Sequence, residues 1–305
     1  ISLRFADEQS VPIHYNYWLQ SALYAAMDKG MGARVHDTGF EGSGRIFRYF
    51  TFSRLLGLFE LAKDRQFIRF PQGCQWVVSS PLNDVLGAMA GGFLQSGVLE
   101  IGPVRAEITE VRVEHPVIGA AAVRTQGSDR IVGDQTIGVR VRTLSPVVSY
   151  STMLKGDGSK YTVYFQPGEP EFQRIVAENL QKKWVGLQNL GNGSERDVTA
   201  TVAAADAVRA AGAGAVDVKL GKRSLGLPAD EDGEMSEDAT YRDIRIRALG
   251  RTQLHIIPYK GGIIKGYSGN LELLGSQSQL QLAVDAGLGS KNAQGFGCLE
   301  VMGKV

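Results

Sequence analysis

Cysteine is scarce in this sequence, with two residues among 305. Cys74 and Cys298 match no zinc-ligand or redox spacing, so we interpret both as small core residues in a reducing compartment. Long apolar runs are also missing, which argues against a membrane span, and residues 1–5 alternate like a strand and not like a secretion signal. These absences predict a cytoplasmic protein without a membrane partner.

Excess charge is lacking as well, because the net charge is only +1. Its distribution is uneven: seven acidic residues and one arginine lie between residues 230 and 243, a local sum of −6, so the remainder carries +7. If this segment is an acidic surface loop, the rest of the protein can still present a basic face. With 43% hydrophobic residues, a chain of this length is expected to form two domains.

One order of elements occurs twice along the chain. The first set is strand, helix, strand, strand, helix, strand over residues 3–5, 15–29, 49–55, 66–70, 82–95 and 98–113. The second set, with a hairpin around Gly156, covers residues 139–144, 170–187, 244–249, 263–273, 277–286 and 296–301. We predict an α+β fold of two tandem ferredoxin-like (RRM-like) β-α-β-β-α-β domains, residues 1–124 and 136–305.

A glycine-rich loop joins the last predicted helix to the last predicted strand. Its glycines can adopt positive φ and bring N–H groups close to an anionic backbone; they are Gly287, Gly289, Gly295 and Gly297. Between them stand the polar residues Ser290, Lys291, Asn292 and Gln294. The helix–loop–strand order argues against both a dinucleotide fingerprint and a P-loop, which need a helix after the glycines. A tight connection without a ligand remains an open alternative.

Basic residues alternate with apolar ones in two predicted strands. Arg140 and Arg142 alternate with valines, and Arg245 and Arg247 alternate with isoleucines. If the arginine-bearing faces line a groove, the arginines would contact the phosphates of an RNA strand. If the faces point into bulk water, the arginines would only increase solubility. In the helix over residues 170–187, we expect Lys182 and Lys183 to be exposed beside the buried stripe.

Several stretches resemble the CRISPR repeat-processing endoribonucleases, the Cas-six family of the RAMP superfamily. They are Lys-Gly-Tyr-Ser-Gly at 265–269, the glycine-rich loop with its flanks at 286–298, and residues 12–24, 50–55, 144–147 and 170–172. The resemblance covers nearly the whole chain in the family's order. Residues 189–253 depart from it and look like a lineage-specific insertion.

The resemblance implies an endoribonuclease that binds CRISPR repeat RNA and cuts precursor CRISPR RNA once within each repeat. In this family the 2′-hydroxyl attacks the adjacent phosphate, leaving a 2′,3′-cyclic phosphate and a 5′-hydroxyl, without a metal or other cofactor. The histidines are scattered without metal-ligand spacing, which fits that expectation. Subunits of a CRISPR effector complex are further candidate partners, and a homodimer is left open.

The resemblance also implies catalytic residues. His36, in an expected loop after the first helix, matches the catalytic histidine by position, and histidine transfers protons near neutral pH. Tyr24 aligns with a tyrosine that some members place beside the scissile phosphate. Arg48 stands where some members have a catalytic lysine, and since arginine does not readily give up a proton, we expect it to act as an electrostatic clamp. The glycine-rich loop is expected to hold the RNA backbone through main-chain amides and Lys291.

Two other readings stay open. A catalytically inactive repeat-binding relative would keep the fold and the loop without cutting RNA. A structural subunit of an effector complex would travel with partner proteins. The extent of the resemblance and the presence of His36 favour the nuclease.

Overall fold

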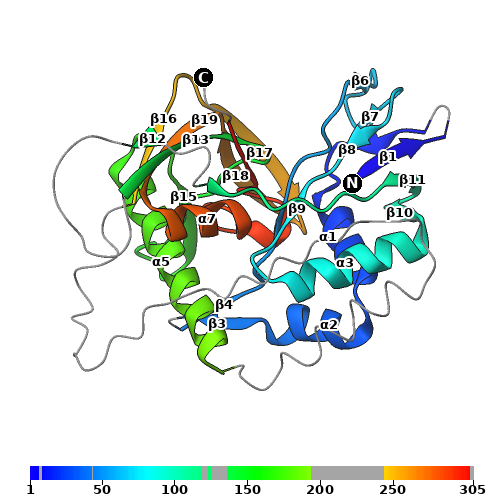
Figure 1. Ribbon diagram of the computed structural model, residues 1–305. Helices are drawn as coiled ribbons and strands as arrows, with labels where there is room; N and C mark the ends of the chain where they lie inside the picture. Colours follow the sequence, from blue (N-terminus) through cyan, green and yellow to red (C-terminus); the bar gives the residue numbers. More distant parts are fainter. Residues whose placement is uncertain (7–8, 43, 119–122, 125–135, 194–243, 303–305) are drawn as a thin grey trace.

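The computed structural model describes residues 1–6, 9–42, 44–118, 123–124, 136–193 and 244–302 (Figure 1). Two α+β halves lie side by side, and in each half helices cover one face of an antiparallel sheet. The predicted tandem ferredoxin-like fold is confirmed. One buried hydrophobic cluster runs through both halves.

The C-terminal half has the ferredoxin-like strand order. The strands in spatial order are β20 (Leu299–Val301), β13 (Thr136–Thr143), β19 (Asn270–Ser276) and β16 (Arg245–Ala248), with β12 (Val123–Arg124) also on β13. Helices α5 (Pro170–Gly193) and α7 (Gln277–Asp285) cover the sheet. Val139 and Val141 are buried, as the alternation of β13 predicts. Helix α7 begins with a capping box of Ser276 and Gln279.

The N-terminal half is built around β1 (Ser2–Phe5). The other strands of its sheet are β11 (Val104–Glu110) and β8 (Cys74–Gln75) on either side of β1, and β10 (Val98–Ile101) beyond β11. Two helices pack below it, α1 (Asn16–Ala26) and α3 (Asn83–Ser96). They approach closely at Gly92, where a Cβ atom would stand 1.8 Å from the main-chain oxygen of Ala26. Only glycine allows this contact.

Several predicted elements of the N-terminal half were wrong in detail. The strands expected at 49–55 and 66–70 lie outside the main sheet; the structure has β5 (Thr51–Phe52) paired with β9 (Val78–Ser79), and β7 (Phe67–Arg69) paired with β2 (Val11–Pro12) and β6 (Glu60–Leu61). The strand expected at 98–113 is the hairpin of β10 and β11, which turns at Gly102. The first helix ends at Ala26, because Asp28 caps a separate helix α2 (Lys29–Ala33).

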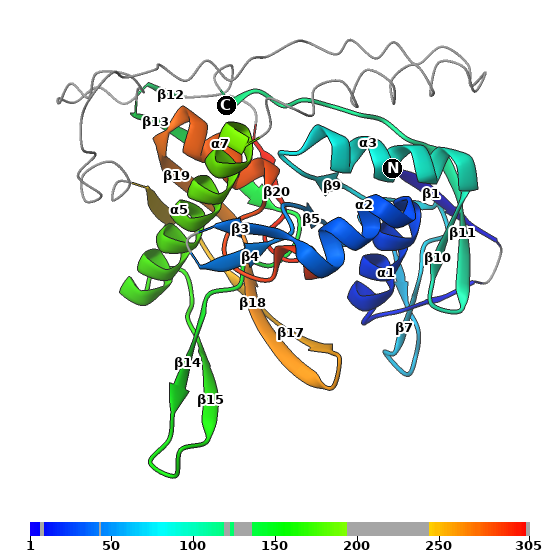
Figure 2. The same cartoon turned by 90° about the horizontal axis from the view of Figure 1, so that it is seen from below.

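Three hairpins complete the described chain. They are β3 (Phe40–Gly42) with β4 (Arg45–Phe47), β14 (Tyr150–Leu154) with β15 (Lys160–Tyr164), and β17 (Gln253–Tyr259) with β18 (Gly262–Ser268). Figure 2 shows the second and third projecting from the same side of the molecule. The second contains the turn predicted around Gly156.

Part of the expected insertion at 189–253 belongs to the fold. Residues 189–193 continue α5, and β16 pairs with β19 in the main sheet. The acidic segment 230–243 lies outside the described residues. Within the described part of the chain, no helix has both the length and the apolar character needed to cross a membrane.

Candidate active site

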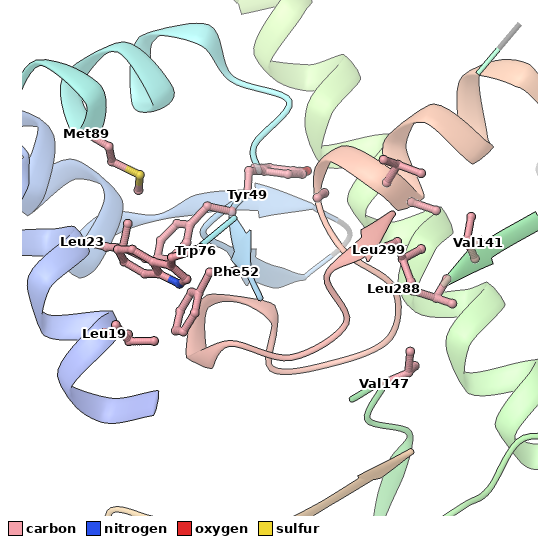
Figure 3. Packing of buried hydrophobic residues seen from close by; sticks show 14 of the residues in the cluster. Leu19, Leu23, Tyr49, Phe52, Trp76, Met89, Val141, Val147, Leu288 and Leu299 are labelled. Atoms are coloured by element: carbon pink, nitrogen blue, oxygen red, sulfur yellow. The ribbon is translucent and has the colours of Figure 1, made fainter. Parts of the chain in front are cut away.

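The glycine-rich loop after α7 lies between the two halves, and it contains one short 3-10 turn, η2 (Asn292–Gln294). Side chains of the N-terminal half bind its main-chain oxygens. Asn16 Nδ2 donates to Gln294 O at 3.0 Å, and Gln20 Nε2 donates to Ala293 O at 2.7 Å. Thr51 Oγ1 donates to Phe296 O at 2.9 Å. The loop therefore connects the two halves of the protein, in addition to joining a helix to a strand. Figure 3 shows it passing between two groups of core residues.

All four glycines of this loop have positive φ and lie against protein atoms. A Cβ at Gly295 would stand 2.3 Å from the ring of Phe52, and one at Gly289 would stand 2.6 Å from Val148 O. Gly287 meets Thr51 and Gly297 meets Leu288 O in the same way. The glycines thus serve close packing inside the protein, which is the alternative the sequence left open.

The loop's amide groups are partly used by the protein too. The N–H groups of Ser290, Gln294, Gly295 and Gly297 donate to main-chain oxygens at 2.8 to 2.9 Å. We expected main-chain amides of this loop to face RNA, and these four N–H groups do not have that role in this structure. The loop residues that line the cavity described below are Ser290, Lys291, Asn292, Ala293 and Gln294.

Lys183 was expected on the solvent face of α5, and this was wrong. The side chain of Lys183 is buried, and its Nζ atom donates to Gly287 O at 2.6 Å and to Gly289 O at 3.2 Å. Burial, with a smaller contribution from the positive charge of Arg45, lowers the pKa of Lys183 to about 7. The ammonium group thus anchors the start of the glycine-rich loop to α5.

A signal for this burial was present in the sequence. Lys183 follows Val176 and Leu180 at i+7 and i+3, so it falls on the buried stripe of the helix. Asn179 lies on the same stripe at the cavity described next, and its buried Oδ1 atom has no hydrogen-bond partner among the described residues. Polar residues on a core stripe identify both as candidates for a site.

A cavity of about 360 Å³ lies where the loop meets the N-terminal half. Tyr24, His36 and Arg48 line it from the N-terminal half, and Lys183 and Lys291 line it from the C-terminal half. The structure therefore brings the three predicted catalytic residues together with the polar part of the glycine-rich loop. Cationic side chains dominate the charge of this cavity, which suits a phosphate ligand.

The three predicted catalytic side chains are in mutual contact or linked through the main chain. The rings of Tyr24 and His36 meet edge to face with centroids 4.8 Å apart. His36 Nδ1 lies 2.6 Å from Asp37 Oδ1, and Arg48 donates to His36 O at 2.9 Å. With 59% of its side chain exposed, His36 is accessible to a substrate.

His36 does not lie in an open loop, as we expected, but in a wide π-helical turn, η1 (Arg34–Thr38). Gly39 ends this turn at φ +61°, and a Cβ atom there would stand 2.3 Å from Ile46 Cγ2. A π turn at a functional residue is common, since the extra residue changes the direction of a side chain.

The hydroxyl of Tyr24 is kept protonated by its surroundings. Burial raises the pKa of Tyr24, and the Arg48 guanidinium beside it opposes that rise. A phenol with a raised pKa can donate a hydrogen bond at neutral pH but cannot act there as a base.

The four arginines of the C-terminal sheet lie elsewhere. Arg142 pairs with Glu300 at 2.6 Å and Arg247 with Glu272 at 2.7 Å on the exposed face. Arg140 and Arg245 are exposed on the same strands, and none of these four described side chains lines the cavity. Their role in RNA binding stays a prediction, and the ion pairs reduce the positive charge that this face presents.

Among the residues that the structure describes, no cluster of three or more His, Cys, Asp or Glu side chains could hold a metal ion. The cavity instead collects hydroxyl, amide, imidazole and cationic groups. Such groups can transfer protons and stabilise negative charge.

Two family models match this chain. The family model "CRISPR associated protein Cas6, C-terminal" matches residues 132–301, and "CRISPR-associated protein Cas6, N-terminal" matches residues 10–112. A search of curated proteins found no significant match.

Solved structures share the fold at low sequence identity. A Cas6-related protein from Pyrococcus furiosus has a TM-score of 0.62 at 16% identity, with 99% of this chain and 96% of that chain covered. A RAMP protein described as binding different RNA substrates has a TM-score of 0.62 at 15% identity, with 99% and 97% covered. A Cas6 product complex has a TM-score of 0.55 at 13% identity, with 99% and 97% covered. The family models, which together span both halves, show that this chain belongs to the Cas6 family of CRISPR-associated proteins.

Proposed function

We propose that this protein is a metal-independent endoribonuclease that binds CRISPR repeat RNA and cuts precursor CRISPR RNA within each repeat. The observation that carries the proposal is the shared cavity, where Tyr24, His36 and Arg48 meet the polar side chains of the glycine-rich loop. Two related structures, one a Cas6 product complex and one a RAMP protein described as binding different RNA substrates, support an RNA substrate.

The proposed reaction is attack by a ribose 2′-hydroxyl on the neighbouring phosphate. The new bond joins the 2′-oxygen to phosphorus, and the bond to the 5′-oxygen of the next nucleotide breaks. The products are a 2′,3′-cyclic phosphate and a 5′-hydroxyl. The 2′-hydroxyl must lose a proton, the 5′-oxygen must gain one, and the transition state gains negative charge.

The contacts of His36 favour its role as the base. If Nδ1 carries the ring proton and donates it to Asp37, Nε2 has a free lone pair for the 2′-hydroxyl proton. The protonated hydroxyl of Tyr24 then serves the 5′-oxygen as a hydrogen-bond donor and proton source. Arg48 and Lys291 supply positive charge to the phosphate.

A cleavage assay with the repeat RNA from the genome that encodes this protein tests the proposal. We expect one cut per repeat in the presence of EDTA, with a 3′ end that resists periodate until the cyclic phosphate is removed. His36→Ala should lower the single-turnover rate by about a hundredfold or more while binding is retained. The matched control is His115→Ala, since His115 is an exposed histidine outside the cavity.

Other outcomes would identify the two alternative functions. Binding of the repeat without any cut by the wild-type chain would indicate an inactive repeat-binding relative. Co-purification with other CRISPR proteins, together with no cleavage by the isolated chain, would indicate a structural subunit of an effector complex. A requirement for a divalent ion would contradict the proposed chemistry. Size-exclusion chromatography with light scattering would test the dimer that the sequence left open.

A further inference from the structure

A second cavity, of about 490 Å³, lies between the tip of the β17–β18 hairpin and the start of α1. Its aromatic lining comes from both halves of the chain: Tyr17 and Trp18 on α1, and Tyr259 on β17. His14, Lys260 and Ile263 complete the part of the lining used below. Tyr17 and Trp18 are exposed, whereas Tyr259 is buried and belongs to a small hydrophobic cluster. The proposed cleavage chemistry does not require any of these rings.

The rings form a connected surface, which we call the aromatic platform (Tyr17, Trp18 and Tyr259). Tyr17 and Trp18 have centroids 5.2 Å apart, and Tyr17 meets Tyr259 edge to face at 6.3 Å. Tyr17 is 39% exposed and Trp18 is 40% exposed, although both are large aromatic residues. A cluster of open aromatic faces is the usual contact surface for nucleobases, because every base has a π face.

The backbone at Gly102 supports the Trp18 ring. A Cβ atom at Gly102 would stand 3.0 Å from Cε2 and Nε1 of the Trp18 indole, so the glycine backbone packs directly on that ring. The remaining exposure of Trp18 is therefore on parts of the ring that the Gly102 backbone does not cover. A ring supported in this way needs little ordering when a ligand stacks on it.

Lys260 adds a fixed positive charge to the platform. Lys260 and Gly261 have φ values of +48° and +76°, as in a two-residue type I′ turn that joins β17 to β18. Its Nζ lies 4.9 Å from the centroid of the Tyr17 ring. Aromatic faces beside a cation match a nucleotide, which has a planar base and an anionic phosphate. The described lining contains no carboxylate that would repel that phosphate.

The platform continues into the candidate active site. Lys260 lines both cavities. The Tyr259 hydroxyl donates to Gln20 Oε1, and Gln20 Nε2 in turn binds Ala293 O in the glycine-rich loop. An RNA strand that leaves the cleavage cavity past Lys260 would reach the platform next.

We propose that the aromatic platform is a subsite for one unpaired base of the substrate RNA, close in the strand to the scissile phosphate. This inference rests on the proposed function, because it places the base relative to the cut. The base stacks on Trp18 or Tyr17, and Lys260 contacts the phosphate beside it. His14 in the same cavity can hydrogen-bond to the edge of the base.

A double-substitution experiment tests the subsite. Trp18→Ala should weaken binding of the repeat RNA by about 5- to 150-fold, the range for loss of one base–aromatic stack. An abasic nucleotide, placed in turn at each unpaired position near the cut, should weaken wild-type binding by a similar factor at one position. At that position the abasic RNA should have little further effect in Trp18→Ala, because the two changes remove the same contact. Phe59→Ala is the control, since Phe59 is an exposed aromatic outside both cavities.

Tryptophan fluorescence gives a readout that is independent of cleavage. Of the three tryptophans, Trp76 is buried and Trp184 is half-buried, so Trp18 is the exposed one. Quenching by the repeat RNA, present in the wild type and lost in Trp18→Phe, is expected. The subsite would be overturned if Trp18→Ala and the abasic nucleotide had independent effects on binding at every position and RNA left the fluorescence unchanged. Cleavage by the wild type in the same experiments would still uphold the proposed function. Unchanged RNA binding together with loss of a co-purifying protein in Trp18→Ala would assign the platform to a protein partner and overturn the subsite. If the wild type neither binds nor cuts the repeat, the proposed function fails, and the subsite with it.

Discussion

The ammonium group of Lys183 donates a 2.6 Å hydrogen bond to the main-chain oxygen of Gly287 inside the protein. This contact fixes the start of the glycine-rich loop to α5, while Asn16, Gln20 and Thr51 fix its later part to the N-terminal half. The position of the loop is thus set by two halves of the chain at once. The cavity with Tyr24, His36 and Arg48 depends on that position.

Loss of the Lys183 anchor should impair cleavage. Lys183→Met leaves the oxygens of Gly287 and Gly289 without this donor, and a displaced loop would misplace the side chain of Lys291. We expect the single-turnover cleavage rate to fall about tenfold or more. Lys182→Met, the same exchange at the neighbouring half-buried lysine, should have little effect. Equal rates in both variants would show that the anchor is not needed for cleavage.

Stability should depend on pH through the same lysine. The pKa of Lys183 falls from 10.5 to about 7 on folding, mainly because of burial. Between these values the unfolded chain binds the extra proton, so rising pH favours the folded state by up to about 1.4 kcal/mol per unit. The unfavourable contribution is complete below about pH 7 and fades toward pH 10.5.

Urea unfolding of the wild type and Lys183→Met at about pH 6, 7.5 and 9 measures this term. The free energy of unfolding of the wild type should rise relative to the variant as pH increases. If the difference in free energy of unfolding between the two proteins stayed constant with pH, Lys183 would not change its protonation on unfolding in this range.

Arg48 should act through its charge. Arg48→Gln removes the cation beside Tyr24, and we expect the single-turnover rate to fall about a hundredfold, as for loss of one transition-state contact. Arg48→Lys keeps the charge and should retain more activity than Arg48→Gln. If both variants are equally slow, the bidentate geometry of the guanidinium matters more than its charge.

Lys291 should contact a phosphate of the RNA. Its Nζ lies 4.9 Å from the Tyr150 ring at the edge of the cavity. Lys291→Gln should weaken repeat binding and reduce the slope of log K against log salt by about 0.7. Lys63→Gln is the control, because Lys63 is exposed and lines neither cavity. An unchanged affinity across the salt titration would remove Lys291 from the RNA site.

Gly295 should be essential for the contact between the halves. Gly295→Ala would place a Cβ 2.3 Å from the Phe52 ring, so we expect the free energy of unfolding to fall by about 3 kcal/mol or more. Gly158→Ala is a close control, since φ is +80° there and +83° at Gly295, but no atom of the described residues lies within 4 Å of a Cβ at Gly158. The control should lose only about 1 kcal/mol. Similar losses in thermal or urea unfolding would show that the loop can move away from Phe52.

The sequence by itself determined the α+β class, the positions of the long helices and the family. Periodicity of 2 and 3.6 residues is local, so alternating valines in β13 and the stripe of α5 were visible without coordinates. The helix–loop–strand context of the glycines was readable for the same reason, whereas the three candidate catalytic residues came from the resemblance to the family.

Only the tertiary structure decided what the glycine-rich loop contacts. A glycine with positive φ serves a ligand or a neighbouring strand equally well, and here the neighbours are Phe52, Thr51 and Val148. Lys183 illustrates the same limit, because its place on the buried stripe could be counted but its partners lie about a hundred residues away in the chain. Contacts between distant segments depend on how the two sheets pack together, and no local pattern encodes that packing.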